Sequence, residues 1–328
     1  MFVVTGASGF IGSNVLAVLE QKGKSALAAV DFRESEAKTR NTQKRKGLTW
    51  VAPTEIEAFL FKHAPDIEAL IHLGAETATT ATDRDAVFAV NVDLSKFLWR
   101  WCIETDTSLI YASSASVYGD GQQGFEDRQQ LVEMRRLRPL NIYGESKLAF
   151  DCFVTEQVEA GGPTPPQWAG LRFFNVFGPN EMHKGPQASV VSQMYPVIAE
   201  GSPYPLFRSH RTDVADGEQK RDFIFVDDCI AVIQWLLENT TVSGVFNVGT
   251  GRARTFLDLA HAVYASAGLE SKITWRDTPD HLKAHYQYFT EADMSRLRKA
   301  GFARPFTSLE DGVTITIRDY LSQADPYR

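Results

Sequence analysis

The sequence predicts an α/β fold in which a doubly wound parallel β-sheet is joined to a second, smaller mixed α/β domain. Three observations support this prediction. Short apolar runs alternate with segments of helical periodicity up to about residue 175. A glycine-rich turn follows the first apolar run, and an aspartate ends the second run about 20 residues later. Beyond residue 176 the order of strands and helices becomes mixed.

The first strand is expected in "MFVVTG", and a helix follows in "FIGSNVLAVLEQKG" because Ile11, Val15, Val18 and Leu19 have helical spacing. Further strands are expected in "ALAAVD", "LTWV" and "EALIHLGA", with a helix in "TEIEAFLFKHA" before the last of them. A long helix over residues 84–104, a strand in "SLIYASS", a helix in "NIYGESKLAFDCFVTEQVEAG" and a strand in "WAGLRFFNVFG" continue the alternation. The polar residues 33–47 are expected to form a solvated loop.

Composition favours a globular protein that binds a small molecule. The chain has 328 residues, 44% hydrophobic and 23% charged, which is enough to bury a sizeable core. Its net charge of -7 argues against broad binding to nucleic acid or to an anionic membrane. Cys102, Cys152 and Cys229 lack metal-ligand spacing, so we expect reduced thiols and no metal site. No apolar stretch is long enough to cross a bilayer and no leader is evident, so we expect a cytoplasmic protein.

The turn "TGASGFIG" is typical of a dinucleotide site. Glycines 6, 9 and 12 allow a tight turn, close approach of backbone N–H groups to a pyrophosphate, and close packing of the following helix. Asp31, at the end of the second strand, is placed to accept hydrogen bonds from a ribose diol. Arg33 and Lys38 could instead neutralise a 2′-phosphate, so the residues leave NAD and NADP both open.

We therefore expect residues 1–175 to form a dinucleotide-binding domain, to which residues 227–254 return through the strand "GVFNVGTG". Residues 176–226 and 255–328 are expected to form the substrate-binding domain. This second domain would contain a helix in "SVVSQMYPVIAEG" and three later helical segments.

A serine, a tyrosine and a lysine could form an acid–base group. Tyr143 and Lys147 are four residues apart in an expected helix, which places both on one face. A nearby ammonium and a positive nicotinamide ring would lower the pKa of the phenol from about 10, so that Tyr143 could exchange a substrate proton. Ser114, at the end of the fifth strand, is placed to hydrogen-bond the same substrate hydroxyl.

These residues resemble the extended short-chain dehydrogenase/reductase superfamily, whose members act largely on nucleotide-activated sugars and share the Rossmann fold. "TGASGFIG", "HLGA", "YASSASVYG", "YGESK", "RFFNVFGP", "RDFIFVDD" and "FNVGTG" occur in the expected order along the whole chain. The resemblance implies that Ser114, Tyr143 and Lys147 are catalytic. Two departures are "WVAP", where an acidic residue is usual, and Pro186, where a backbone donor is expected.

Within that superfamily, "FNVFGPNEMHKGPQASV", "SHRTDVADGEQKRDF", "NVGTGRARTF" and "YQYFTEADMSRLRKAGF" resemble the ADP-glyceromanno-heptose 6-epimerase family. The resemblance implies inversion of C6″ of an ADP-activated heptose by transient oxidation to a ketone, with Lys184 as a second acid–base group beside Tyr143. It implies NADP as cofactor, with NAD possible, although Phe32 is an unusual neighbour for the phosphate-facing Lys38.

The residues implied in cofactor binding are Gly6, Gly9, Phe10, Ile11, Gly12, Asp31, Phe32, Lys38, Leu73, Ala75, Asn91, Tyr143, Lys147, Val176 and Lys184. Those implied in binding the ADP-sugar are Ser114, Asn175, Pro186, Gln193, Phe207, Arg221 and Tyr286.

Several alternatives stay open at this level. Lys184 could only neutralise the substrate pyrophosphate or touch the cofactor, and Arg221 could form a surface salt bridge with an acidic neighbour. Tyr286 could be a packing aromatic and Asn175 a strand-end cap. A UDP-hexose 4-epimerase needs the same serine, tyrosine and lysine but no second lysine. A sugar 4,6-dehydratase carries an Asp-Glu pair where Ala115 and Ser116 stand, and a non-catalytic dinucleotide sensor typically lacks the tyrosine or the lysine.

Two helices have more apolar positions than one sheet face needs, namely those containing "FAVNVDLSKFLWRW" and "LAFDCFVTEQV". We expect them to pack against another subunit in a homo-oligomer, as these helices often do in the resembling family. Burial within one chain is the alternative reading.

Overall fold

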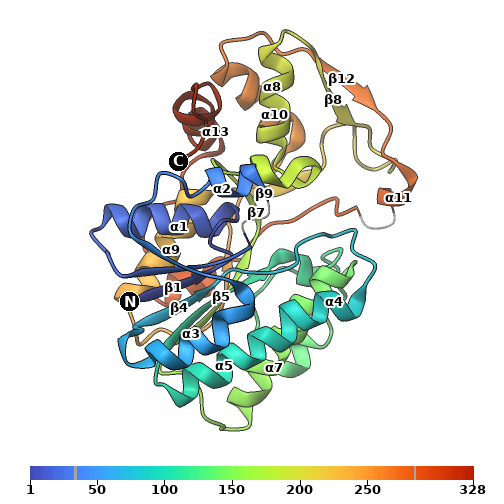
Figure 1. The fold of residues 1–328 in the computed structure, drawn as a ribbon. Coiled ribbons are helices and arrows are strands. Elements are labelled where there is room, and N and C mark those ends of the chain that lie inside the picture. The colour runs from blue at the N-terminus through green and yellow to red at the C-terminus, as the bar shows by residue number, and fades with distance from the viewer. Residues whose placement is uncertain (33–34, 284–285) are drawn as a thin grey trace.

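The computed structural model describes residues 1–32, 35–283 and 286–328. Its centre is a seven-stranded parallel sheet in the order β10-β6-β5-β4-β1-β2-β3 (Figure 1). The strands are β1 (Phe2–Thr5), β2 (Leu27–Val30), β3 (Leu48–Val51), β4 (Ala69–His72), β5 (Ser108–Ser114), β6 (Trp168–Phe173) and β10 (Gly244–Val248). The order reverses beside β1, which in such sheets marks the crevice where ligands bind. The doubly wound α/β fold predicted from the sequence is confirmed.

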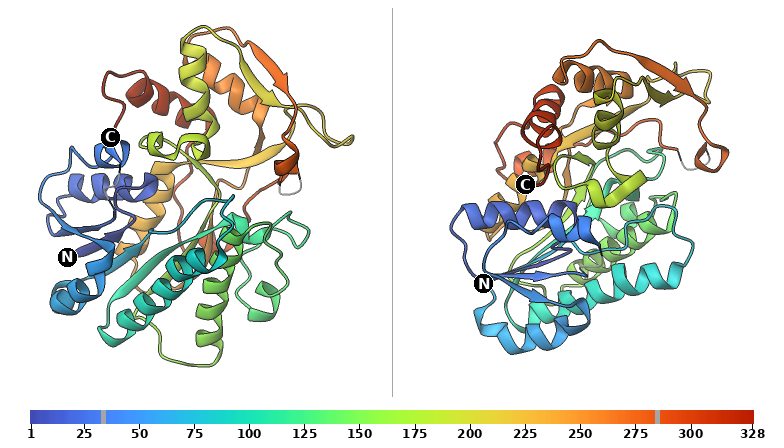
Figure 2. Two further views of the ribbon diagram at one scale, coloured as in Figure 1. Left: turned by 45° about the vertical axis from the view of Figure 1, so that its right-hand side comes forward. Right: turned by 45° about the horizontal axis from the view of Figure 1, so that its top comes forward.

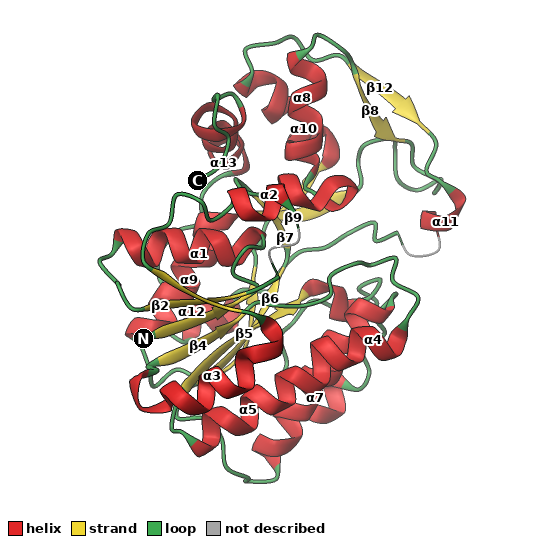
Figure 3. Cartoon of the chain, viewed as in Figure 1, coloured by secondary structure: helices red, strands yellow, loops and turns green. Residues whose placement is uncertain are grey.

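Helices cover both faces of this sheet, as Figures 2 and 3 show. The helices up to β10 are α1 (Phe10–Gln21), α2 (Glu36–Arg40), α3 (Ile56–His63), α4 (Arg84–Phe88), α5 (Leu94–Glu104), α6 (Leu131–Met134), α7 (Ile142–Glu159), α8 (Val190–Ala199) and α9 (Val226–Glu238). Val3 packs with α3, α5 and α7 on one face, whereas Val4 packs with α1 and α9 on the other. Burial on both faces explains why these strands are continuous apolar runs.

The later part of the chain builds two small sheets and a helical layer above the carboxyl edge of the main sheet (Figure 1). One sheet has the order β11-β9-β7 and the other pairs β12 with β8. The strands are β7 (Asn175–Phe177), β8 (Tyr204–Phe207), β9 (Lys220–Phe225), β11 (Ala253–Thr255) and β12 (Ile273–Arg276), and the remaining helices are α10 (Phe256–Ser266), α11 (Asp280–Lys283), α12 (Ser295–Lys299) and α13 (Leu309–Thr316). Of these helices α12 packs against β10 of the main sheet, whereas α8 lies beside α10 in the upper layer (Figure 3). The expected limits of the two domains stay a prediction.

Three local expectations were wrong. The polar segment expected as a loop contains α2, because Ser35 caps the helix by accepting a hydrogen bond from the Lys38 amide at 3.2 Å. The long helix expected over residues 84–104 is interrupted by a π-helical segment, Ala89–Asp93. The expected sixth strand is divided between β6 in the main sheet and β7 in a small one.

Among the described residues, no helix is long and apolar enough to cross a membrane.

Candidate active site

The glycine-rich turn joins β1 to α1, and two of its positions have no space for a side chain. Gly6 has φ +65°, and a Cβ there would lie 2.7 Å from the amide nitrogen of Gly74 in the loop after β4. A Cβ on Gly12 would lie 2.1 Å from the carbonyl oxygen of Gly6. The turn therefore brings backbone close to backbone at the amino end of α1, where N–H groups favour a pyrophosphate. These residues fit a dinucleotide.

Asp31 directly follows β2 beside this turn, and both of its carboxylate oxygens have partners. The Ser8 amide donates to Oδ2 at 2.8 Å, and the Lys38 ammonium donates to Oδ1 at 3.0 Å. Phe32 is exposed. The structure thus pairs the residue suited to a ribose diol with the residue suited to a 2′-phosphate. Arg33, the other basic candidate, lies outside the described residues.

The loop after β4 carries the next predicted cofactor residues, Leu73 and Ala75, and is tied to β1 by a hydrogen bond from the Leu73 amide to the Thr5 carbonyl. Asn91, in the π-helical segment, is buried. Its amide group accepts from the Glu76 amide at 2.8 Å and donates to Ser146 Oγ at 2.9 Å. Asn91 therefore fastens this loop to α7, the helix with the predicted tyrosine and lysine.

Ser114, Tyr143 and Lys147 come together where β5 ends and α7 begins. The Ser114 hydroxyl donates to Ser116 Oγ at 3.2 Å, and it acts to lower the pKa of Tyr143. The Lys147 ammonium lies 6.0 Å from the centre of the Tyr143 ring and donates to the Ala112 carbonyl in β5 at 3.0 Å. Asn141 caps α7 by accepting from the Gly144 amide, which fixes the start of the helix next to the strand end.

Burial shifts the pKa values of both Tyr143 and Lys147. Burial raises the pKa of Tyr143, and the neighbouring Ser114 hydroxyl only partly opposes that rise. The expected lowering of this pKa depends also on the charge of a bound nicotinamide ring, and it stays a prediction. Burial also lowers the pKa of Lys147 to about 8, while the Asp151 carboxylate acts in the opposite direction.

Behind this group lies a buried ion pair that sequence reasoning missed. Arg172 Nε donates to Asp151 Oδ2 at 2.9 Å, and both side chains are fully buried. Asp151 also accepts from Ser113 Oγ at 2.9 Å. An arginine inside the apolar run of β6 was the available signal, because a buried guanidinium requires a partner. The pair links β5, β6 and α7 beneath the candidate catalytic residues.

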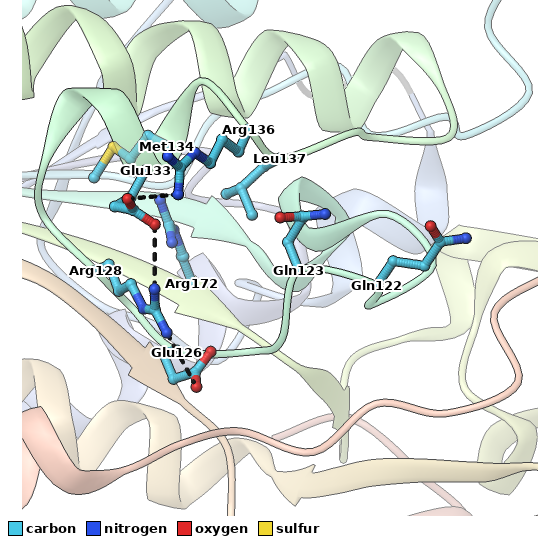
Figure 4. A pocket seen from close by; sticks show the side chains of 9 residues that line it. All are labelled: Gln122, Gln123, Glu126, Arg128, Glu133, Met134, Arg136, Leu137 and Arg172. Carbon is cyan, nitrogen blue, oxygen red and sulfur yellow. Dashed lines mark hydrogen bonds and ion pairs between the residues drawn. The ribbon is translucent and has the colours of Figure 1, made fainter.

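A cavity of about 260 Å³ opens on the outer side of Arg172 (Figure 4). Its wall includes Arg128 and Arg136, both paired with Glu133. None of the described residues that line it is a predicted site residue. We therefore place the candidate active site not in this cavity but at the carboxyl edge of the main sheet.

Lys184 lies in the segment between β7 and α8, and its side chain is 26% exposed. Its ammonium is 5.1 Å from the centre of the Phe10 ring, at the amino end of α1, and 3.5 Å from Glu181 Oε2. Lys184 and Phe10 are thus brought together at the glycine-rich turn. Within the described part of the chain no contact joins Lys184 to Tyr143.

Arg221 and Tyr286 form a second group. Arg221 lies in β9, and Tyr286 lies in the segment between α11 and α12. The Arg221 guanidinium lies 5.4 Å from the centre of the Tyr286 ring. Arg221 is buried, and burial lowers its pKa to about 10. In residues 1–32, 35–283 and 286–328 no carboxylate forms an ion pair with it, so the expected alternative of a surface salt bridge does not describe it. Asn175 is exposed in β7 and accepts from Thr290 Oγ1 at 3.3 Å.

The other predicted substrate residues are spread along the upper wall. Phe207 ends β8 beside a concavity of about 470 Å³, which is lined by Arg208, Ser209, His210, Asp277, Thr278, Pro279, Asp280 and Lys283. The His210 ring is 5.8 Å from the Tyr286 ring, which connects this concavity to the Arg221 group. Gln193 in α8 donates to the carbonyls of Ala188 and of the exposed Pro186. Val176 is half-buried in β7.

Comparisons with known proteins give the family. Residues 2–249 match the model of the NAD dependent epimerase/dehydratase family. The ADP-L-glycero-D-manno-heptose-6-epimerase of Nitratidesulfovibrio vulgaris (strain DP4) is 44% identical over 329 residues, which covers 100% of both chains. Among solved structures, the Helicobacter pylori enzyme of the same name has a TM-score of 0.77 at 26% identity, covering 98% of this chain and 94% of that one.

A further solved structure, MoeE5 in complex with UDP-glucuronic acid and NAD, has a TM-score of 0.75 at 25% identity and covers 97% of each chain. The full-length identity and the family match agree with the motif order described above. The chain therefore belongs to the NAD dependent epimerase/dehydratase family and, within it, to the ADP-L-glycero-D-manno-heptose-6-epimerases.

Proposed function

We propose that this chain converts ADP-D-glycero-D-manno-heptose to ADP-L-glycero-D-manno-heptose by inverting C6″. Full-length identity of 44% to a relative of that name supports the substrate. A bound nicotinamide would supply the acceptor and later the donor of the C6″ hydride. The chain's own residues then have two tasks, which are to hold the sugar and to move a proton on and off its oxygen.

The proton transfers require two groups, because the oxygen on C6″ lies on different sides of the sugar before and after inversion. When the hydride leaves C6″, one group removes the hydroxyl proton and a ketone forms. When the hydride returns to the opposite face, the other group protonates the oxygen. We assign these roles to Tyr143 and Lys184 without fixing their order. The observation that carries this assignment is that they come from different elements, α7 and the segment after β7.

The ADP part of the substrate would be held by the upper wall. Arg221 is a buried cation that forms no ion pair with a carboxylate among the described residues, which favours an anionic ligand such as a diphosphate. The concavity beside Phe207 adjoins it through His210 and Tyr286. We propose that Asn175, Pro186, Gln193 and Phe207 complete this surface.

We propose NADP as the cofactor, with NAD as the alternative. The family is NAD dependent, and MoeE5 was solved with NAD, which supports a nicotinamide cofactor in general. Lys38 favours NADP because its ammonium, next to Asp31, could pair with a 2′-phosphate. We also propose that the chain acts in the cytoplasm as a homo-oligomer through α5 and α7.

The test is direct conversion of the sugar. Purified protein is incubated with ADP-D-glycero-D-manno-heptose and, separately, with UDP-glucose, and NMR follows the configuration at C6″ and at C4 of the hexose. The proposal expects inversion at C6″ and no inversion at C4. Conversion of UDP-glucose alone would favour the 4-epimerase, and binding without any turnover would favour the non-catalytic sensor.

A further inference from the structure

A buried carboxylate lies one turn before Lys184. Glu181 is 1% exposed, although glutamate is rarely buried without partners. Its Oε1 accepts from the Gly178 amide at 3.1 Å and from Ser189 Oγ at 2.6 Å. Its Oε2 accepts from the Ser189 amide at 2.7 Å and lies 3.5 Å from the Lys184 ammonium. Every one of these partners belongs to residues 178–189.

These contacts fasten both ends of the segment that carries Lys184. Gly178 directly follows β7, and Ser189 is the N-cap of α8. Ser192, in the first turn of α8, also donates to Oε1 at 3.3 Å. A carboxylate at this helix terminus is favoured by the unpaired N–H groups and by the helix dipole. Glu181 is therefore held by the fold and does not depend on Lys184 for its position.

Lys184 is held differently. Its ammonium contacts the Glu181 carboxylate on one side and the face of Phe10 on the other. The residue after it, Gly185, has φ +51° and nothing within 4 Å of a Cβ built there. Among the described residues, Glu181 and Phe10 are the side chains that contact the Lys184 ammonium.

We propose that Glu181 is a positioning residue for Lys184, holding the ammonium beside Phe10 at the glycine-rich turn so that it can exchange a proton with the substrate oxygen. This role rests on the proposed function of Lys184. No covalent step is assigned to Glu181, and it does not touch the reacting atoms. The neighbouring charged groups, Asp31 and Lys38, pair with each other and leave Glu181 as the partner of Lys184.

A double-mutant cycle tests whether Glu181 acts through Lys184. Glu181→Gln keeps the size of the side chain but removes its charge, and it should lower kcat by about tenfold or more while KM and cofactor affinity stay within about twofold. Adding Glu181→Gln to Lys184→Met should then cause no further loss of kcat. Glu133→Gln is the matched control, because Glu133 also pairs with a basic residue three positions along and lies outside the site.

A measurement that does not need turnover separates this role from the proposed function. Amine acylation followed by mass spectrometry reports how freely each lysine reacts. Lys38 serves as internal reference, since its ammonium is paired with a carboxylate and its side chain is 27% exposed, against 26% for Lys184. Glu181→Gln should raise acylation of Lys184 by about threefold or more and leave that of Lys38 unchanged.

Unchanged acylation of Lys184, or losses in kcat that simply add in the cycle, would overturn the positioning role. If the wild-type protein does not epimerise the heptose but Lys184 is released by Glu181→Gln, the proposed function fails and the positioning contact stands. Should Glu181→Gln not fold, Glu181→Asp replaces it, because the shorter side chain keeps the charge but withdraws it from the ammonium. The same acylation result is then expected.

Discussion

The Lys147 ammonium donates a hydrogen bond of 3.0 Å to the carbonyl oxygen of Ala112, in the strand that ends at Ser114. This contact joins α7, which carries Tyr143, to β5, which carries Ser114. The same ammonium lies 6.0 Å from the centre of the Tyr143 ring. The role of each residue can therefore be tested separately.

Removing the Tyr143 hydroxyl tests its part in proton transfer. Tyr143→Phe keeps the ring and should lower kcat by about 10²- to 10⁴-fold, the usual contribution of a general acid or base. Cofactor affinity, measured by nicotinamide fluorescence, should change by less than about threefold, because the ring still packs in place. A kcat within about threefold of wild type would remove Tyr143 from the mechanism.

The charge on Lys147 predicts an alkaline limit to activity. Burial lowers its pKa to about 8, so the ammonium is present below that pH and is lost above it. Loss of the positive charge weakens the stabilisation of a Tyr143 phenolate, and kcat should therefore fall as the pH rises through about 8. Lys147→Arg is the control, because arginine stays charged throughout this range. Its kcat should be lower but should not show the same alkaline fall.

Lys38 should decide between the two dinucleotides. Its ammonium lies 3.0 Å from Asp31, so Lys38→Ala removes the positive charge and leaves the carboxylate facing the ribose. Affinity for NADP should fall by about tenfold or more, while affinity for NAD should stay equal or rise. Lys22→Ala, which breaks a surface pair with Glu238, is the control. Equal losses for NADP and NAD would show that Lys38 does not read the phosphate.

Lys184→Met tests the second acid–base group. The methionine side chain retains much of the lysine's apolar stem but cannot exchange a proton, so epimerisation should fall by about 10²-fold or more. Cofactor binding should persist, because the glycine-rich turn is unaltered. Lys46→Met, at an exposed position, controls for loss of a charge. Full activity of Lys184→Met would leave the lysine with only a cofactor or pyrophosphate contact.

Local patterns were sufficient to predict the main sheet and the glycine-rich turn. Buried parallel strands are apolar along their whole length, and this pattern is visible in the sequence. Gly6 and Gly12 could be predicted because the tight turn leaves no space for a side chain at either position. The helix α2 escaped prediction because its residues are polar and only the Ser35 cap identifies it. The main sheet, the glycine-rich turn and α2 are all determined by residues that are close together in the sequence.

Contacts between distant residues could not be predicted in this way. Arg172 and Asp151 are joined across β6 and α7, and Arg221 meets Tyr286 from another segment. The spacing of Glu181 and Lys184 is visible in the sequence, but the burial of Glu181 depends on the first turn of α8. The Arg172–Asp151 pair, the Arg221–Tyr286 contact and the burial of Glu181 all depend on tertiary packing. Burial by the same packing raises the pKa of Tyr143.

The most direct test of the account is the fate of the hydrogen on C6″ during inversion in D₂O. Because the same hydride is taken from C6″ and returned to its opposite face, NMR and mass spectrometry should find ADP-L-glycero-D-manno-heptose with its original C6″ proton. Deuterium at C6″ in the product would mean that the carbon was deprotonated by the protein and not oxidised, which would contradict the account. An absence of inverted product would contradict it as well.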